Sequence, residues 1–309
     1  MKNRSVMAAT TIDQKPSRRR PPWLAPALLI VPAFLVVFAL AAYSAVWLLQ
    51  LSMVKLTFGD PFRTAEWVGL ENYNWLLFNE FTTFWASLRV TAVYVLGTLV
   101  PELVIGFLIA LLLNRKMRGN SIFTAALIIP MVLMPSMVGM VGRLYFSPYG
   151  LINYFIESLT GIRHNWYGAD LALWAAVLVD IWEWTPFFIL ILLAGLQTLP
   201  IEPYEAARVD GASRLQAFVH LTLPLMLPLI MTTLILRLMD VLRLFDVIFV
   251  MFGGGPGTST TTLPLYIYRT TLIQRDVGRG SAASVMLIII IVSLTVILIK
   301  LRDRIRYEA

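Results

Sequence analysis

Residues 281–299 read SAASVMLIIIIVSLTVILI, nineteen consecutive residues without a charged side chain. The hydrocarbon core of a bilayer is about 30 Å thick, and an α-helix crosses it with about 20 apolar residues. The strands of a transmembrane β-barrel alternate apolar and polar residues, but Val285 to Val292 are apolar at every position. This stretch therefore predicts a transmembrane helix.

Five further blocks of the chain have the same character. They are residues 21–54, 90–114, 119–142, 171–199 and 221 to about 252. Over the whole chain, 58% of the residues are hydrophobic and 14% are charged, whereas a soluble domain is about half apolar and about a quarter charged. We predict an all-α membrane protein whose six transmembrane helices lie between residues 21 and 301.

The distribution of Lys and Arg predicts the orientation of these helices. The N-terminal tail, the loops around residues 115–118 and 208–214, and the C-terminal tail hold 15 of the 25 Lys and Arg residues, and the three opposite loops hold eight. Cytoplasmic segments are enriched in these residues, so we expect both termini in the cytoplasm, in tails 1–20 and 302–309. The net charge of +7 then indicates orientation rather than nucleic-acid binding. The first block is too long for the apolar region of a signal peptide.

The sequence contains little that resembles a catalytic or cofactor site. A phosphate-binding P-loop contains Gly-Lys followed by Ser or Thr, and none of the five lysines follows a glycine. The glycine-rich residues 253–257 are interpreted as a mobile external turn rather than a phosphate site. The chain has no cysteine and only two histidines, His164 and His220. We expect no metal and no cofactor on this chain, so any ATP would be hydrolysed by a partner.

The cytoplasmic loop formed by residues 200–224 is the most informative segment. Pro203 suits the first position of a helix, and Gly211 permits the left-handed residue that ends one. Ser213, followed by Gln216 three residues later, is a capping-box pattern that opens a second helix. We expect that helix to reach about Leu223 and to be interrupted by Pro224. The segment therefore predicts a helical hairpin.

This hairpin resembles the EAA loop of binding-protein-dependent ABC transporter permeases. The family pattern is Glu-Ala-Ala, three residues, Gly, nine residues, an aliphatic residue, one residue and Leu-Pro, and the sequence matches it from Glu205 to Pro224 with Leu221 as the aliphatic residue. The resemblance implies that the hairpin docks on a cytoplasmic ATPase subunit. The alternative is a solvated first-turn Glu205 on a surface loop. The residues implied in coupling are Glu205, Ala206, Ala207, Arg208, Asp210, Gly211, Leu223 and Pro224.

The resemblance extends along most of the chain. Residues 68–73 (VGLENY), 253–256 (GGGP) and 266–268 (YIY) are similar to the carbohydrate-uptake branch, in particular to MalF/UgpA-like subunits in a minimal six-span form. This implies the permease fold of a type I ABC importer in the inner membrane of a prokaryote. It also implies a second, MalG-like permease subunit, two copies of an ATPase that binds ATP and Mg²⁺, and an extracellular or periplasmic sugar-binding protein. The sequence does not identify the sugar.

Several charged residues lie inside the predicted spans, where they are costly and commonly face a bundle interior or a watery cavity. One reading is that they line a sugar pathway together with aromatic faces, including those of Trp184 and Phe245. The other is that they form internal salt bridges, or that Arg243 and Asp246 lie at the outer interface. Glu102 is open to the same two readings. The pathway candidates are Asp180, Trp182, Glu183, Arg237, Asp240, Arg243, Asp246 and Tyr145.

Two other classes of function are alternatives to a permease subunit. A secondary, ion-coupled transporter commonly shows inverted repeats or more spans, and no convincing repeat is visible in the sequence. It would also leave the EAA pattern unexplained. A membrane enzyme would need a cluster of acidic residues or histidines at one membrane face, and the acidic residues here are dispersed.

Overall fold

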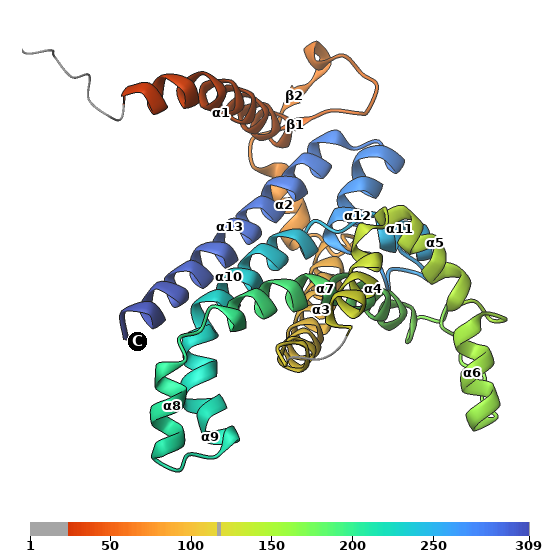
Figure 1. The fold of residues 1–309 in the computed structure, drawn as a ribbon. Helices are drawn as coiled ribbons and strands as arrows, with labels where there is room; N and C mark the ends of the chain where they lie inside the picture. The colour runs from red at the N-terminus through yellow and green to blue at the C-terminus, as the bar shows by residue number, and fades with distance from the viewer. Residues whose placement is uncertain (1–23, 116–118, 309) are drawn as a thin grey trace, which may run out of the picture. The chain divides into compact units, whose positions relative to one another are not determined.

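The computed structural model describes residues 24–115 and 119–308 of the chain. Its regular structure is almost entirely helical, as the sequence predicts (Figure 1). Two units are distinguished, residues 1–48 and residues 49–309. The longest helices are α1 (Leu24–Ser52), α3 (Phe84–Leu113), α7 (Ala172–Gln197), α10 (Leu223–Val241) and α13 (Val277–Glu308). The predicted N-terminal tail 1–20, together with Lys116 and Arg118, lies outside the described residues.

Shorter elements connect the long helices. The short helices are α2 (Glu71–Phe78), α4 (Asn120–Val132), α5 (Pro135–Tyr145), α6 (Leu151–Thr160), α8 (Glu202–Val209), α9 (Arg214–Ala217), α11 (Asp246–Phe252) and α12 (Leu263–Tyr268). Strands β1 (Val54–Lys55) and β2 (Glu66–Trp67) pair in an antiparallel ladder, with the 3₁₀ turn Phe62–Thr64 between them. Two π-helical turns occupy Phe218–Thr222 and Arg269–Ile273.

Five continuous helical stretches are long and apolar enough to cross a membrane, and the count reaches six when one bent pair of helices is treated as a single span. The predicted third block is this bent pair, because α4 and α5 meet at an angle of 96°. Pro135 starts α5, and the residue before it, Met134, is extended (φ −67°, ψ 136°). A residue that precedes proline is disfavoured in the helical region, so the helix breaks there. The third predicted span is therefore a bent pair of helices rather than one continuous helix.

The predicted fifth block also ends early. Helix α10 stops at Val241, and α11 starts afresh at Asp246. Helix α11 then packs on α5, where an added Cβ at Gly139 would meet Val250 at 2.9 Å. The expectation of one helix from residue 221 to about 252 was therefore wrong, because the chain turns after Val241 to bury the apolar face of α11.

The packing of α3 against α7 forms the centre of residues 49–309. A Cβ at Gly106 of α3 would stand 2.5 Å from Cβ of Phe188 in α7, so a side chain at this position would force the two helices apart. The buried core continues from this contact onto α10 and α11 through Ile230 and Ile248. Helix α13 packs along α10 and α12. This arrangement places α3, α7 and α10 side by side around the charged residues described below.

Candidate functional site

Helix α8 carries the Glu-Ala-Ala motif and begins at Glu202, so that Pro203 lies one position later than predicted. It ends as the sequence predicts, because Gly211 adopts a left-handed conformation (φ +79°). The amide of Ala212 donates to the carbonyl of Ala207 (2.9 Å), which satisfies a carbonyl in the last helical turn. An L residue other than glycine adopts this conformation only at a cost, and this explains the glycine.

The second helix of the hairpin opens with the predicted capping box. The amide of Gln216 donates to Ser213 Oγ (3.3 Å), and the amide of Ser213 donates to Gln216 Oε1 (2.8 Å). The interruption predicted at Pro224 was wrong, because helical structure continues from Arg214 to Val241. A π-helical turn over Phe218–Thr222 precedes Pro224, which occupies the first turn of α10. Proline is tolerated in a first turn because its missing N–H is not needed there.

The hairpin offers an exposed surface. No residue of α8 is buried, and Glu205, Ala206, Arg208 and Asp210 are all exposed while Ala207 is half-buried. Val209 beside them is 87% exposed. A hydrogen bond of 3.0 Å between Tyr204 Oη and Thr222 Oγ1 joins the two arms of the hairpin. Small and apolar residues exposed in this way are typical of a surface that meets a partner.

A buried ionic cluster joins three helices at the level of Arg237. Arg237 donates from Nε and Nη2 to the two oxygens of Glu102 (both 2.9 Å), and Nη2 also donates to Asp180 Oδ2 (2.6 Å). The side chains of Arg237, Glu102 and Asp180 are fully buried. Nη1 completes the cluster by donating to Asp240 Oδ2 (2.8 Å). One cation thus holds carboxylates from α3, α7 and its own helix, and the bidentate pair is the strongest geometry available to arginine.

Several buried polar side chains lie around this cluster, and some of their oxygens lack a hydrogen-bond partner among the described residues. Glu183 is buried, and its Oε2 has no hydrogen-bond partner among the described residues. The same holds for Asp180 Oδ1 and Tyr94 Oη. The guanidinium of Arg237 lies over the ring of Trp184, 4.5 Å from its centroid. Burial of an isolated charge is costly, so the cluster is stable only while Arg237 remains in place.

Asp240 differs from the other carboxylates because 43% of its side chain is exposed. Arg243 and Asp246 were expected on the same helix, but they lie beyond the end of α10 and do not join the cluster. Arg243 instead lines a cavity of about 340 Å³ together with Phe245 and Tyr268. The rings of Phe245 and Tyr268 stand 5.1 Å apart. Ligand pockets are commonly lined by apolar and aromatic side chains with a few polar groups, and here Arg243 is the charged residue of the lining.

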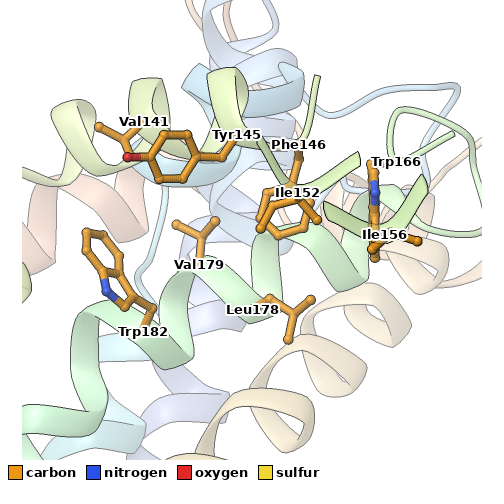
Figure 2. A pocket seen from close by; sticks show the side chains of 10 residues that line it. Val141, Tyr145, Phe146, Ile152, Ile156, Trp166, Leu178, Val179 and Trp182 are labelled. Atoms are coloured by element: carbon orange, nitrogen blue, oxygen red, sulfur yellow. The ribbon is translucent and has the colours of Figure 1, made fainter. Parts of the chain in front are cut away.

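Tyr145 and Trp182 lie elsewhere, at an apolar cavity of about 430 Å³ between α5, α6 and α7 (Figure 2). Trp182 and Leu178 project from one face of α7, whereas Asp180 and Glu183 project from the opposite face, as expected for steps of about 100° per residue. The pathway candidates therefore divide between two sides of α7. Apart from the hydroxyl of Tyr145 and the indoles, the side chains lining this cavity are hydrocarbon.

Part of the site was not predictable from the sequence. The pairing of Glu102 with Arg237 links residues 135 positions apart, and the only sequence signal was that each is a charged residue within an apolar block. Nothing in the sequence indicated that Tyr94 lies beside this cluster. The glycine-rich turn accepts hydrogen bonds from Thr261 Oγ1 at the Gly254 carbonyl (2.8 Å) and from Arg269 at the Gly253 carbonyl. Within the described residues, no three His, Cys, Asp or Glu side chains are grouped as a metal site.

Comparison with known proteins identifies the family in which these features occur. Residues 83–306 match the family described as "Binding-protein-dependent transport system inner membrane component". The chain is 37% identical over 235 residues to the trehalose/maltose transport system permease protein MalF of Thermococcus litoralis, covering 75% of this chain and 79% of that protein. It is 34% identical over 300 residues to the sulfoquinovosyl glycerol transport system permease protein SmoG of Agrobacterium fabrum, covering 94% and 96%.

A solved structure supports the same architecture. A chain of a bacterial ABC transporter involved in the import of the acidic polysaccharide alginate superposes with a TM-score of 0.76 and 22% identity. The superposition covers 91% of this chain and 96% of that one. At this identity the likeness establishes the fold, which is the all-α fold that the six apolar blocks predict.

Proposed function

Since the chain belongs to the family of inner membrane components of binding-protein-dependent transport systems, we propose that this ABC importer permease carries a sugar or a related polyol or sugar phosphate. Relatives that share a third or more of its residues are permeases for trehalose/maltose and for sulfoquinovosyl glycerol. Family membership sets aside an ion-coupled secondary transporter. The chain acts in the plasma membrane of a prokaryote.

We propose further that a partner ATPase drives this permease through the hairpin. The observation that carries this part of the proposal is a continuous helical connection from the hairpin to the ionic cluster. Helical structure runs without a break from Arg214 to Val241, and at 1.5 Å per residue this spans about 40 Å. Its first turn is fixed by the capping box of Ser213, and its last turns carry Arg237 and Asp240. A rigid element with two discrete positions is what transmits a movement between distant sites.

In this scheme the exposed surface of α8 docks on the partner ATPase. Glu205 and Arg208 supply charges for the contact, Ala206 and Ala207 permit close approach, and Gly211 makes the turn. Leu223 and Pro224 join the hairpin to α10. Closure of two ATPase subunits around ATP and Mg²⁺ would then push or tilt α10, while this chain contributes no catalytic residue and binds no cofactor.

The sugar pathway is assigned to the side of α10 on which Asp240 is exposed. Sugars are held by planar polar groups and by aromatic faces, and Asp240, Arg243, Phe245 and Tyr268 offer both. Arg237, Asp180 and Glu183 lie behind this surface and hold the helices that carry it. Further candidates for contact with the cargo are Asp246, Tyr145 and Trp182.

The complete transporter would combine this chain with a second, MalG-like permease, two ATPase subunits and an extracellular sugar-binding protein. The test is reconstitution of these chains in lipid vesicles with a panel of labelled disaccharides, polyols and glycerol phosphates. We expect uptake of one class that requires ATP on the ATPase side and the binding protein on the other. Uptake that persists without ATP, or uptake of amino acids instead of sugars, would contradict the proposal.

A further inference from the structure

Helix α6 presents an apolar face away from the rest of the molecule. Leu151, Tyr154, Phe155 and Leu159 recur at helical spacing and are all exposed, with Leu159 at 86%. They occupy one side of the helix because residues three and four apart are neighbours on its surface. Tyr149, 88% exposed, extends the face at its N-terminal end. The arrangement is the reverse of a water-soluble surface helix, whose outward face is polar.

The position of α6 along the chain sets its side of the membrane. It lies between α5 and α7, whereas the α8–α9 hairpin follows the other end of α7. The two segments accordingly lie at opposite ends of α7 (Figure 1). Since α7 is a membrane span and the hairpin faces the cytoplasmic ATPase, α6 lies at the outer surface.

The orientation of α6 is fixed by buried polar contacts. Asn153, on the inward face, is 1% exposed and donates to the carbonyl of His164 (2.9 Å), while its Oδ1 accepts from the indole of Trp166 (3.2 Å). In the loop that follows α6, the hydroxyl of Tyr167 donates to the carbonyl of Arg143. Burial raises the pKa of Tyr167, which keeps that donor protonated. The outward apolar face is therefore held in one direction.

The surface next to α6 is also apolar and exposed. Leu144 of α5 is 63% exposed, and Leu178 of α7, a residue of a membrane span, is 47% exposed. The outward face of α6 continues this apolar surface. Its residues are Tyr, Phe and Leu with Ser158, and aromatic rings of this kind concentrate at the level of lipid headgroups. Arg163 pairs with Glu157 (2.6 Å), and its guanidinium lies over the ring of Tyr149, 5.1 Å from the centroid, so the charges border the strip at its N-terminal end.

We propose that α6 is an interfacial helix whose apolar face inserts into the outer leaflet of the bilayer. The helix would lie along the membrane surface with Tyr154, Phe155 and Leu159 among the headgroups and upper acyl chains, which is the usual placement of an amphipathic interfacial helix. Lipid is thus the partner of this face. The inference depends on the membrane location of the chain and not on the identity of its cargo.

The chain contains no cysteine, so single cysteines introduce unique labelling sites. We would place nitroxide labels at Phe155→Cys and Leu159→Cys, with Thr160→Cys as the matched control, because Thr160 is exposed on the opposite side of the same helix. The assembled transporter is reconstituted in vesicles of phosphatidylcholine and phosphatidylglycerol. Collision rates are measured with oxygen, which dissolves in lipid, and with a water-soluble nickel chelate.

We expect labels at Phe155 and Leu159 to collide with the nickel chelate about tenfold less often than the label at Thr160, and to collide more often with oxygen, as inserted side chains do. Equal access of the nickel chelate at all three positions would overturn the proposal, since the face would then be in water. Shielding of Phe155 and Leu159 from both reagents would also overturn it, because a protein partner would then cover the face.

A second measurement uses the unmodified chain, so that a misfolded variant does not decide the outcome. A lipid that carries a photoactivatable diazirine in the upper part of its acyl chain is incorporated in the same vesicles. After illumination, we expect the lipid to be attached to the peptide that contains residues 149–162. Absence of that adduct, with labelling of α13 in the same sample as the positive control, would overturn the proposal.

Discussion

Arg237 of α10 donates two parallel hydrogen bonds of 2.9 Å to the carboxylate of Glu102 in α3. Both side chains are fully buried. The pair closes a contact between helices that are far apart in the sequence, and Asp180 of α7 joins it through the same guanidinium. The three central helices of the permease are thus held by one cation.

Removal of that cation should destabilise the protein strongly. In Arg237→Met, Glu102 and Asp180 would be left buried without a counter-charge, and breaking a buried pair in this way costs about 3–5 kcal/mol. We expect a large fall in the thermal unfolding midpoint of the purified complex. Arg243→Met is the matched control, since Arg243 is exposed and, among the described residues, hydrogen-bonds to the carbonyl of Met239 alone. Its expected change is within about 0.5 kcal/mol. Equal stability of the two variants would refute the structural role of Arg237.

Asp240→Asn should alter transport without loss of assembly. Arg237 keeps its bonds to Glu102 and Asp180 in this variant. The amide oxygen of the new side chain can still accept from Arg237 Nη1, so what is lost is the charge of Asp240 and its ion pair with Arg237. We expect uptake to fall several-fold while the complex purifies intact, as measured by vesicle uptake and by substrate-stimulated ATPase activity. If both activities match the unmodified transporter, Asp240 does not contact the cargo.

Charge reversal in the docking helix should uncouple the two halves of the transporter. Glu205→Arg places a cation on the surface of α8 that is proposed to dock on the ATPase, so we expect insertion in the membrane to persist and ATP-driven uptake to be lost. Glu202→Arg, in the first turn of the same exposed helix, is the control and should retain most uptake. Full uptake by Glu205→Arg together with a co-purified ATPase would argue against the assigned docking surface.

The turn of the hairpin should tolerate only residues that adopt a left-handed conformation. Space is available at Gly211, because an added Cβ would meet nothing within 4 Å, so the cost of Gly211→Ala is the backbone strain of about 1 kcal/mol. We expect faster amide exchange in α8 and reduced uptake, with a smaller effect for Gly211→Asn. Gly161→Ala is a matched control at φ +71° with equally open surroundings, located at the end of α6. It should leave coupling intact, and loss of uptake in that variant alone would contradict the assignment.

Most of the local structure could be predicted from the sequence, because it depends on neighbouring residues. The helix end at Gly211 and the capping box of Ser213 are confirmed, and both are decided within four residues. The two long blocks that proved to be broken show where this reasoning fails. Hydropathy detects that residues 119–142 are apolar, but the angle between α4 and α5 depends on what each half packs against.

The residues predicted to line the sugar pathway also show that sequence reasoning fails where packing between distant segments decides the structure. Asp180 and Trp182 are two residues apart, yet one faces Arg237 and the other lines an apolar cavity on the opposite side of α7. Arg243 is predicted to share a transmembrane helix with Arg237, and the end of α10 at Val241 separates them. A helical spacing argument holds only while the helix continues.

The sequence by itself determined that this chain crosses a membrane several times and that its class is a permease, and it predicts which loop docks on the ATPase. Those properties depend on local apolar blocks and on a contiguous motif. Only the tertiary structure decided that Glu102, Asp180 and Arg237 share one site, and that α6 turns its apolar face outward. The pairing of charges and the direction of a helix face depend on which segments lie side by side, and that is set by packing between distant parts of the chain.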